Sequence, residues 1–257
     1  MIFFPNAKIN IGLSVNSKRA DGYHNLESVL YPVQWCDILE VEEKKAADSA
    51  FTLTGLPVGV AHQNNLSFQA IEKIRQRWAI PEVGVHLHKQ IPHGSGLGGG
   101  SSDAAFTLKA INQLFKLNLS RMKLRELAGE LGSDCPFFID NNPVYVWGKG
   151  DQMDPIDLPL HSMHLVVVVP PLSISTARAY QRIKPAKRRQ SLKDTLINTP
   201  INEWHSHVQN DFETALFKEH PWLGDIKSTL YKKGALYASL WGSGSALFGI
   251  FQDPPSI

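Results

Sequence analysis

Hydrophobic and polar positions alternate through the first part of the chain in a way typical of strands. Residues 2–15 and 26–41 are rich in Ile, Val, Leu and Phe, and we expect both to form strands. The polar stretch 16–25 between them contains Lys, Arg, Asp and Gly, which predicts a loop. Valine and leucine occupy every second position of residues 83–88, so this segment predicts a strand with one buried face.

Helical spacing of apolar positions follows in three segments. Apolar side chains recur at helical intervals over residues 65–78. Two further apolar faces predict helices over about residues 101–115 and around 124–131, the second with Gly132 as its C-terminal stop. Residues 133–136 contain Ser, Asp and Pro and predict a turn.

The last third of the chain has fewer regular patterns. The aliphatic run Leu165–Val169 predicts a buried strand, and the predicted domain boundary lies just before it. The predicted domains are therefore residues 1–159 and 160–257. Glycines at 242–245 interrupt the apolar stretch 235–251, which predicts two strands joined by a tight turn.

Composition and charge narrow the class of protein. The chain has 257 residues and a formal net charge of +2, which excludes a dominant basic arm or acidic tail. Cys36 and Cys135 have no metal-type spacing, and two cysteines make no disulfide framework. No apolar run is long enough to cross a bilayer, and the N-terminus lacks signal-peptide features. We expect a soluble cytoplasmic protein with no nucleic-acid or membrane partner.

A glycine-rich segment carries the strongest functional signal. Five glycines lie between Gly94 and Gly100, directly before a predicted helix. Backbone N–H groups without side chains in the way, together with the positive end of a helix, favour phosphate binding. The hydroxyls of Ser101 and Ser102 suit a phosphate or a Mg²⁺ ion. The alternative is a flexible turn with Ser or Asp as helix cap.

Several motifs, taken in their order along the chain, resemble those of the GHMP kinases. The segment Pro92–Ser102 resembles the phosphate loop of that superfamily, which lacks the Walker lysine. The other matching segments are Pro5–Leu13, Arg19–His24, Gly132–Phe138, Asn210–Glu213 and Gly242–Ala246. The resemblance runs from Pro5 to about Phe251. It implies an α+β fold of two domains with the active site in the cleft between them.

The segment Asp21–His24 resembles one branch of the superfamily, whose substrate has a cytidine diphosphate head group. That resemblance implies transfer of phosphate from ATP, with Mg²⁺, to the 2-hydroxyl of 4-diphosphocytidyl-2-C-methyl-D-erythritol in the non-mevalonate isoprenoid route. It makes Asp134 the general base and gives Lys8 the task of orienting or polarising the hydroxyl. Taken alone, Asp134 equally fits a turn or helix cap, and Lys8 an edge position with its ammonium in water.

The resemblance also implies the binding residues. The predicted phosphate contacts are Pro92, His93, Gly94, Ser95, Gly96, Leu97, Gly98, Gly99, Gly100, Ser101 and Ser102. Asn65 and Leu66 are the predicted adenine contacts, and they also fit a helix cap and a core leucine. The predicted substrate contacts are Asn10, Tyr23, His24, Thr176 and Tyr180, where Tyr180 stands at a position that is often Phe in the family. Metal ligands and the oligomeric state are not predicted.

Other interpretations stay open on the sequence. The chain also fits another GHMP kinase acting on mevalonate or homoserine, or a nucleotide sensor without turnover. RNA binding is a third alternative, against which the near-neutral charge speaks. We expect Cys135 to be a packing residue, the Lys187–Arg189 cluster to be a solvated loop, and the histidine pair His86 and His88 not to bind metal.

Overall fold

The computed structural model describes residues 1–44, 51–172, 174–183, 185–186 and 190–256, and it shows a mixture of helices and sheets. The α+β prediction is therefore confirmed. The chain forms two compact units. The first comprises Met1–Lys8, Pro32–His93 and Leu97–Asn142, and the second comprises Ile9–Tyr31, Gly94–Gly96 and Pro143–Ile257. The Lys187–Arg189 cluster, like Lys184, lies outside the described residues.

A four-stranded sheet forms one layer of the first unit. Its strands, in the order β1-β4-β6-β5, are β1 (Ile2–Phe3), β4 (Ile38–Lys44), β6 (Glu82–Lys89) and β5 (Phe51–Gly55). In the antiparallel pair β4–β6, Leu39 lies opposite Leu87 and Val41 opposite Val85, and all four are buried. The prediction that one face of the strand at residues 83–88 is buried is therefore confirmed.

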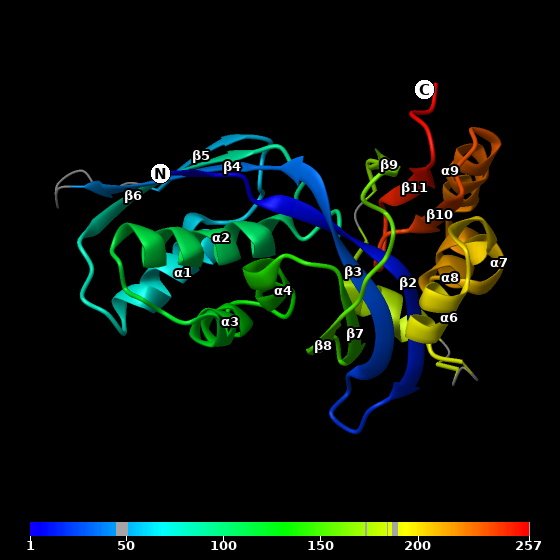
Figure 1. The fold of residues 1–257 in the computed structure, drawn as a ribbon, viewed down its shortest axis with the longest axis horizontal. Helices are drawn as coiled ribbons and strands as arrows, with labels where there is room; N and C mark the ends of the chain where they lie inside the picture. The colour runs from blue at the N-terminus through cyan, green and yellow to red at the C-terminus, as the bar shows by residue number, and fades with distance from the viewer. Residues whose placement is uncertain (45–50, 173, 184, 187–189, 257) are drawn as a thin grey trace. The chain divides into compact units, whose positions relative to one another are not determined.

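Helices cover one face of this sheet (Figure 1). They are α1 (Leu66–Arg75), α2 (Gly99–Leu114), α3 (Arg121–Gly129) and α4 (Cys135–Asp140), with the short 3₁₀ turn η2 (His62–Asn64) before α1. The apolar positions of α2 at Ala104, Ala105, Leu108 and Ile111 are fully buried. Its apolar face thus provides much of the core of the unit.

Two further sheets provide the strands of the second unit, except that β2 up to Lys8 and β3 from Pro32 belong to the first unit. One has the order β2-β3-β7-β8, from β2 (Asn6–Lys18), β3 (His24–Cys36), β7 (Val144–Gly148) and β8 (Gln152–Pro155). The other has the order β10-β11-β9, from β10 (Tyr237–Leu240), β11 (Leu247–Phe251) and β9 (His164–Val168). The strand–turn–strand prediction for residues 235–251 is confirmed, because β10 and β11 pair antiparallel across the glycine turn.

The helices of the second unit are short, and the last two pack on the smaller sheet (Figure 1). They are α5 (Thr176–Arg182), α6 (Leu192–Asn198), α7 (Trp204–His207), α8 (Phe212–Glu219) and α9 (Pro221–Lys232), with η3 (Ile201–Glu203) before α7. Phe212 and Leu216 of α8 join Leu240 and Leu247 in one apolar core. None of the helices in the described ranges has the length and apolar composition needed to cross a membrane.

Several sequence-based boundaries were wrong. Helix α2 begins at Gly99 rather than near residue 101, since two glycines enter its first turn. The predicted turn at 133–136 continues into α4, because Pro136 occupies the first turn of that helix, where its missing N–H costs nothing. The predicted buried strand at 165–169 is an edge strand, β9, whose residues are half-buried or exposed. The predicted loop at 16–25 is shorter, because β2 extends to Lys18.

Candidate active site

The glycine-rich loop connects β6 to α2. Gly94, Gly96 and Gly98 have φ values of 71°, 83° and 75°, a left-handed conformation that other residues rarely adopt. A Cβ atom on Gly98 would also lie 3.0 Å from the ring of Phe138 and 3.1 Å from Cγ of Lys8. At Gly98 both the conformation and the available space therefore require glycine.

The start of α2 leaves backbone donors for a ligand. Gly98 is the N-cap and has no side chain with which to cap the first N–H groups, and Gly100 in the first turn is exposed. The hydroxyl of Ser101 forms a hydrogen bond with the thiol of Cys135. The buried Ser102 Oγ has no hydrogen-bond partner within the described part of the chain. Helix N–H groups without a side-chain cap, together with the positive helix end, suit an anion such as phosphate.

The remaining loop positions differ in exposure. Leu97 is fully buried and Ser95 nearly so, Pro92 is half-buried, and His93 is exposed. The backbone carbonyl of Leu97 accepts a hydrogen bond of 3.0 Å from the N–H of Lys8. This bond fixes the strand that carries Lys8 against the C-terminal end of the glycine loop.

Lys8 and Asp134 lie side by side in the first unit. The Lys8 ammonium is 3.5 Å from Oδ2 of Asp134, and the side chains are 6% and 41% exposed. Asp134 holds the N-cap position of α4, but its side chain makes no capping hydrogen bond. Asp134 is thus at a cap position and β2 is an edge strand of its sheet, as the alternative interpretations expected. Their side chains behave differently, because the carboxylate faces the ammonium and makes no cap, and the ammonium is buried and not in water.

Asn65 serves as a helix cap. Its side-chain oxygen accepts a 2.9 Å hydrogen bond from the backbone N–H of Ser67 at the start of α1. Leu66 is half-buried, and its Cδ1 lies 4.0 Å from the position a Cβ on Gly100 would take. The cap is therefore confirmed, and Leu66 lies beside the first turn of α2.

Aromatic rings gather in the second unit. The ring of His24, at the start of β3, stacks on Tyr180 of α5 with centroids 5.1 Å apart and planes at 22°. The edge of Phe212 supports Tyr180 at 5.0 Å. His24 and Tyr180, two predicted substrate contacts that are far apart in the sequence, are thus adjacent in the structure, with the ring of Phe212 packed against Tyr180.

Tyr23 projects from the turn between β2 and β3, and it is 62% exposed. The turn is held by Arg19 and Asp21: Arg19 Nε donates to both carboxylate oxygens of Asp21, at 3.1 and 3.0 Å, and Asp21 accepts from the N–H of Tyr23 at 3.1 Å. The ammonium of Lys149 lies 5.5 Å from the centroid of the Tyr23 ring, within cation–π range. An exposed, braced aromatic ring is suited to stacking on a planar ligand.

Asn10 lies in the core of the second unit. Its Nδ2 donates to Ser28 Oγ at 3.0 Å, and a Cβ on Gly242 would lie 3.5 Å from its Oδ1. Thr176 is the first residue of α5, and its side chain lies outside the described residues.

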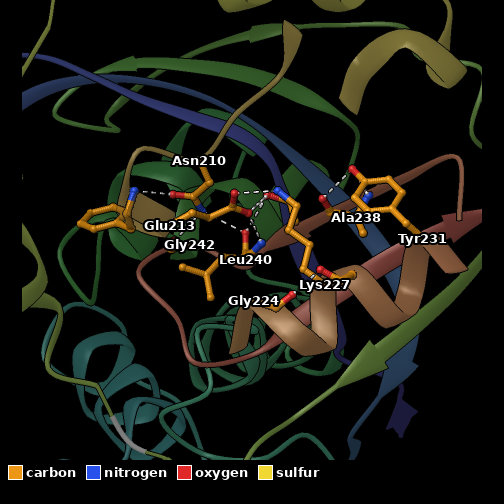
Figure 2. A network of polar contacts seen from close by, with 11 residues as sticks. Asn210, Glu213, Gly224, Lys227, Tyr231, Ala238, Leu240 and Gly242 are labelled. Carbon is orange, nitrogen blue, oxygen red and sulfur yellow. Dashed lines mark hydrogen bonds and ion pairs between the residues drawn. The ribbon is translucent and has the colours of Figure 1, made fainter. Parts of the chain in front are cut away.

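The turn Gly242–Ser245 is anchored by a buried polar network (Figure 2). Asn210 donates through Nδ2 to the carbonyls of Leu240 and Gly242, at 2.9 and 2.8 Å. Glu213 accepts from the N–H of Leu240 at 2.8 Å and from Lys227 Nζ at 2.6 Å. These bonds fix where β10 ends and the turn begins.

The same turn lies beside the glycine loop residues that belong to the second unit. A Cβ on Gly96 would be 3.7 Å from the carbonyl of Trp241 and 3.9 Å from that of Gly244. The network of Asn210 and Glu213 therefore determines the position of backbone that packs against Gly96.

Sequence reasoning missed two groups of charged residues. Lys149 gave no signal, because its contact with Tyr23 depends on the pairing of β3 with β7. A buried cluster of Lys89, Asp37 and Asp103 was also missed, although Asp103 directly follows the Ser101–Ser102 pair. Burial raises the pKa of the Cys135 thiol to about 12, as expected of a packing cysteine and not of a nucleophile.

Comparisons with known proteins show the family of the chain. The family descriptions "GHMP kinases N terminal domain" and "GHMP kinases C terminal" match residues 65–142 and 195–257. A 4-diphosphocytidyl-2-C-methyl-D-erythritol kinase of Parabacteroides distasonis is 47% identical over 99% of this chain and 93% of its own. A relative of the same name from Porphyromonas gingivalis is 43% identical over 100% of this chain and 94% of its own.

Solved structures give the same family. The crystal structure of a 4-(cytidine 5'-diphospho)-2C-methyl-D-erythritol kinase is 32% identical, with a TM-score of 0.80 over 97% of this chain and 90% of its own. A mevalonate kinase from Methanococcus jannaschii shares the fold at 15% identity, with a TM-score of 0.66 over 98% of this chain and 90% of its own. The chain is a small-molecule kinase, and it belongs to the 4-diphosphocytidyl-2-C-methyl-D-erythritol kinase family of the GHMP kinases.

Proposed function

We propose that the chain transfers the γ-phosphoryl group of ATP to the 2-hydroxyl of 4-diphosphocytidyl-2-C-methyl-D-erythritol. The observation that carries the proposal is the contact of Lys8 with Asp134 next to Gly98 and Leu97 of the glycine loop. The names of the relatives supply the substrate. Domain boundaries at 1–159 and 160–257 stay a prediction, which limited proteolysis would test.

Asp134 is the proposed general base. Its carboxylate is 41% exposed and has no capping duty, so it is available to accept the proton of an incoming hydroxyl. The buried ammonium of Lys8 orients that hydroxyl and polarises it. Phosphoryl transfer otherwise depends on positioning and charge neutralisation more than on covalent chemistry.

The glycine loop is the proposed ATP phosphate site. The glycines within Pro92–Ser102 offer backbone N–H donors without side chains in the way, and a Cβ at Gly98 would fill the space beside Lys8. Asn65 and Leu66 are the proposed adenine contacts. When bound with ATP, Mg²⁺ neutralises phosphate charge, and the unpartnered hydroxyl of Ser102 is chemically fit to ligate it.

The aromatic residues of the second unit form the proposed head-group site. Tyr23 offers an exposed ring for stacking on cytosine, while the stacked pair His24 and Tyr180 supplies ring nitrogens and a second aromatic surface. Base–aromatic stacking contributes about 1–3 kcal/mol per base. Asn10 and Thr176 complete the proposed contacts.

The test measures ADP release from MgATP with the cytidyl compound, mevalonate or homoserine as acceptor. We expect turnover only with the cytidyl compound. Turnover with mevalonate or homoserine would contradict the head-group site, and ATP binding without turnover would indicate a nucleotide sensor.

A matched pair of variants locates the head-group site. Tyr23→Ala is expected to raise the KM for the cytidyl compound by about 5- to 150-fold, since one stacking contact is lost, and Tyr23→Phe should leave it near wild type. The KM for ATP should stay unchanged in both. Equal KM values for the cytidyl compound in wild type and Tyr23→Ala would exclude Tyr23 from the site.

A further inference from the structure

Three buried charged side chains meet in the first unit, apart from Lys8 and Asp134. The ammonium of Lys89, at the end of β6, contacts the carboxylates of both Asp37 and Asp103, the latter at 2.5 Å. Lys89 is 4% exposed and the two aspartate side chains 0% and 2%. Asp37 lies between β3 and β4, and Asp103 lies in α2, so the cluster joins three separate elements.

This cluster holds both ends of the glycine loop. On the side before the loop, Asp37 Oδ1 accepts from the backbone N–H of Gln90 at 2.5 Å and of Ile91 at 2.8 Å. On the side after it, Asp103 lies four residues beyond Gly99, in the second turn of α2. A Cβ on Gly99 would lie only 3.3 Å from Lys89 Nζ, so the ammonium packs directly against the loop backbone.

Stability alone is a poor explanation for the cluster. Burying three charges costs desolvation energy that their attraction only partly offsets, and apolar residues of similar volume often stabilise a core as well or better. What an ion cluster adds is fixed geometry, because each hydrogen bond accepts a narrow range of distance and direction.

We propose that Lys89, Asp37 and Asp103 are positioning residues for the nucleotide phosphates. They fix the end of β6 against the start of α2, and so hold the loop N–H groups in a phosphate-binding arrangement before ATP arrives. They act through the loop backbone and do not touch the nucleotide. The inference rests on the proposed use of ATP, and its test is chosen so that the two can fail separately.

Asp103→Ala is the main test variant. It removes the link to α2 and leaves Lys89 paired with Asp37, so the core keeps no uncompensated charge. We expect the KM for ATP to rise about tenfold, because the loop donors are no longer fixed, with the acceptor KM within about twofold of wild type. Asp103→Asn can still accept from Lys89 and should restore the KM for ATP to within about threefold of wild type.

Hydrogen exchange gives a readout without nucleotide. In Asp103→Ala, amides of residues 91–100 should exchange about tenfold faster than in wild type, while those of α8 and α9 stay unchanged. Lys73→Met is the matched control, since it removes a different ion pair of the first unit, with Glu130, and should change neither readout.

The outcomes separate the two proposals. A lowered melting temperature in Asp103→Ala, with unchanged KM for ATP and unchanged exchange of 91–100, would reduce the cluster to a structural role and overturn the inference. Equal effects of the Asn and Ala variants would also overturn it, because the amide preserves the hydrogen bond. If wild type fails to turn over ATP, the proposed function fails, and the exchange of residues 91–100 still decides the positioning role.

Discussion

Lys89 and Lys8 both contact aspartates in the first unit, but in opposite surroundings. Lys89 and its partners are at most 4% exposed, and the ammonium bonds directly to both carboxylates. Lys8 is nearly as buried, yet Asp134 is 41% exposed and their separation is 3.5 Å. A fully buried ion cluster can hold backbone segments in fixed positions. A solvent-exposed carboxylate beside a buried cation can still be reached by a ligand.

Removing the open carboxylate should give the largest effect, and it should fall on activity. Asp134→Asn is expected to lower kcat by about 10²–10⁴-fold, because the hydroxyl loses its proton acceptor. The melting temperature should stay close to wild type, since the side chain caps nothing. Asp140→Asn, at the other end of α4, is the control and should keep its kcat. Near-normal turnover by folded Asp134→Asn would remove Asp134 from the mechanism.

Removing the cation of the closed cluster should lower stability, in addition to its effect on the glycine loop. Lys89→Met leaves the buried side chains of Asp37 and Asp103 without their shared cation, and breaking a buried ion pair in this way costs about 3–5 kcal/mol of unfolding free energy. Urea denaturation measures the loss. The double variant Lys89→Met with Asp103→Asn should recover part of it, because Asp37 keeps its two backbone donors. No recovery would show that the loss of stability does not come from the unpaired Asp103 carboxyl.

The pH dependence of stability is a further test of the buried Lys89 cluster, through the carboxyl of Asp103. In the unfolded chain the Asp103 carboxyl ionises near its ordinary pKa of 3.8, whereas in the folded protein it holds its proton to about pH 8. Between these values the folded state binds the extra proton, so its stability falls as pH rises, by up to about 1.4 kcal/mol per pH unit. Chemical denaturation of Asp103→Asn over this range should show a shallower fall. Parallel curves for the two proteins would rule out a raised pKa at Asp103.

The smallest effect is expected at the surface. Lys73 pairs with Glu130 at 2.7 Å between α1 and α3, where water screens the attraction. Lys73→Met should therefore lower the unfolding free energy by less than about 1 kcal/mol, and less still at high salt. A loss as large as that of Lys89→Met would mean that burial does not explain the difference between these ion pairs.

Much of the site could be predicted from sequence because its signals are local. Five glycines before a helix predict a phosphate loop whatever surrounds them, and the left-handed φ values of Gly94, Gly96 and Gly98 agree with that composition. The motifs at Lys8, Asp134 and Tyr23 depend on residue type and order along the chain. The alternation in residues 83–88 likewise determined which face of β6 is buried.

Local signals failed where a boundary depends on packing. Glycine disfavours helix, yet Gly99 and Gly100 begin α2, where the close approach of Ile91 and Lys89 excludes a side chain at Gly99. The strand at Leu165–Val169 has the composition of a buried strand, but β9 forms an edge because, among the strands of the described ranges, only β11 pairs with it.

The sequence by itself determined the class of fold, the glycine loop and the identity of the candidate catalytic pair. Only the tertiary structure decided which carboxylates are buried against a lysine and which stay exposed to solvent. Asp37 and Lys89 are 52 residues apart, and their contact exists because β4 pairs with β6 and α2 packs against β4. Charge and spacing along the chain report what a side chain can do, but burial is a property of the folded state. The same lysine–aspartate chemistry thus gives a closed cluster at Lys89 and an open pair at Lys8.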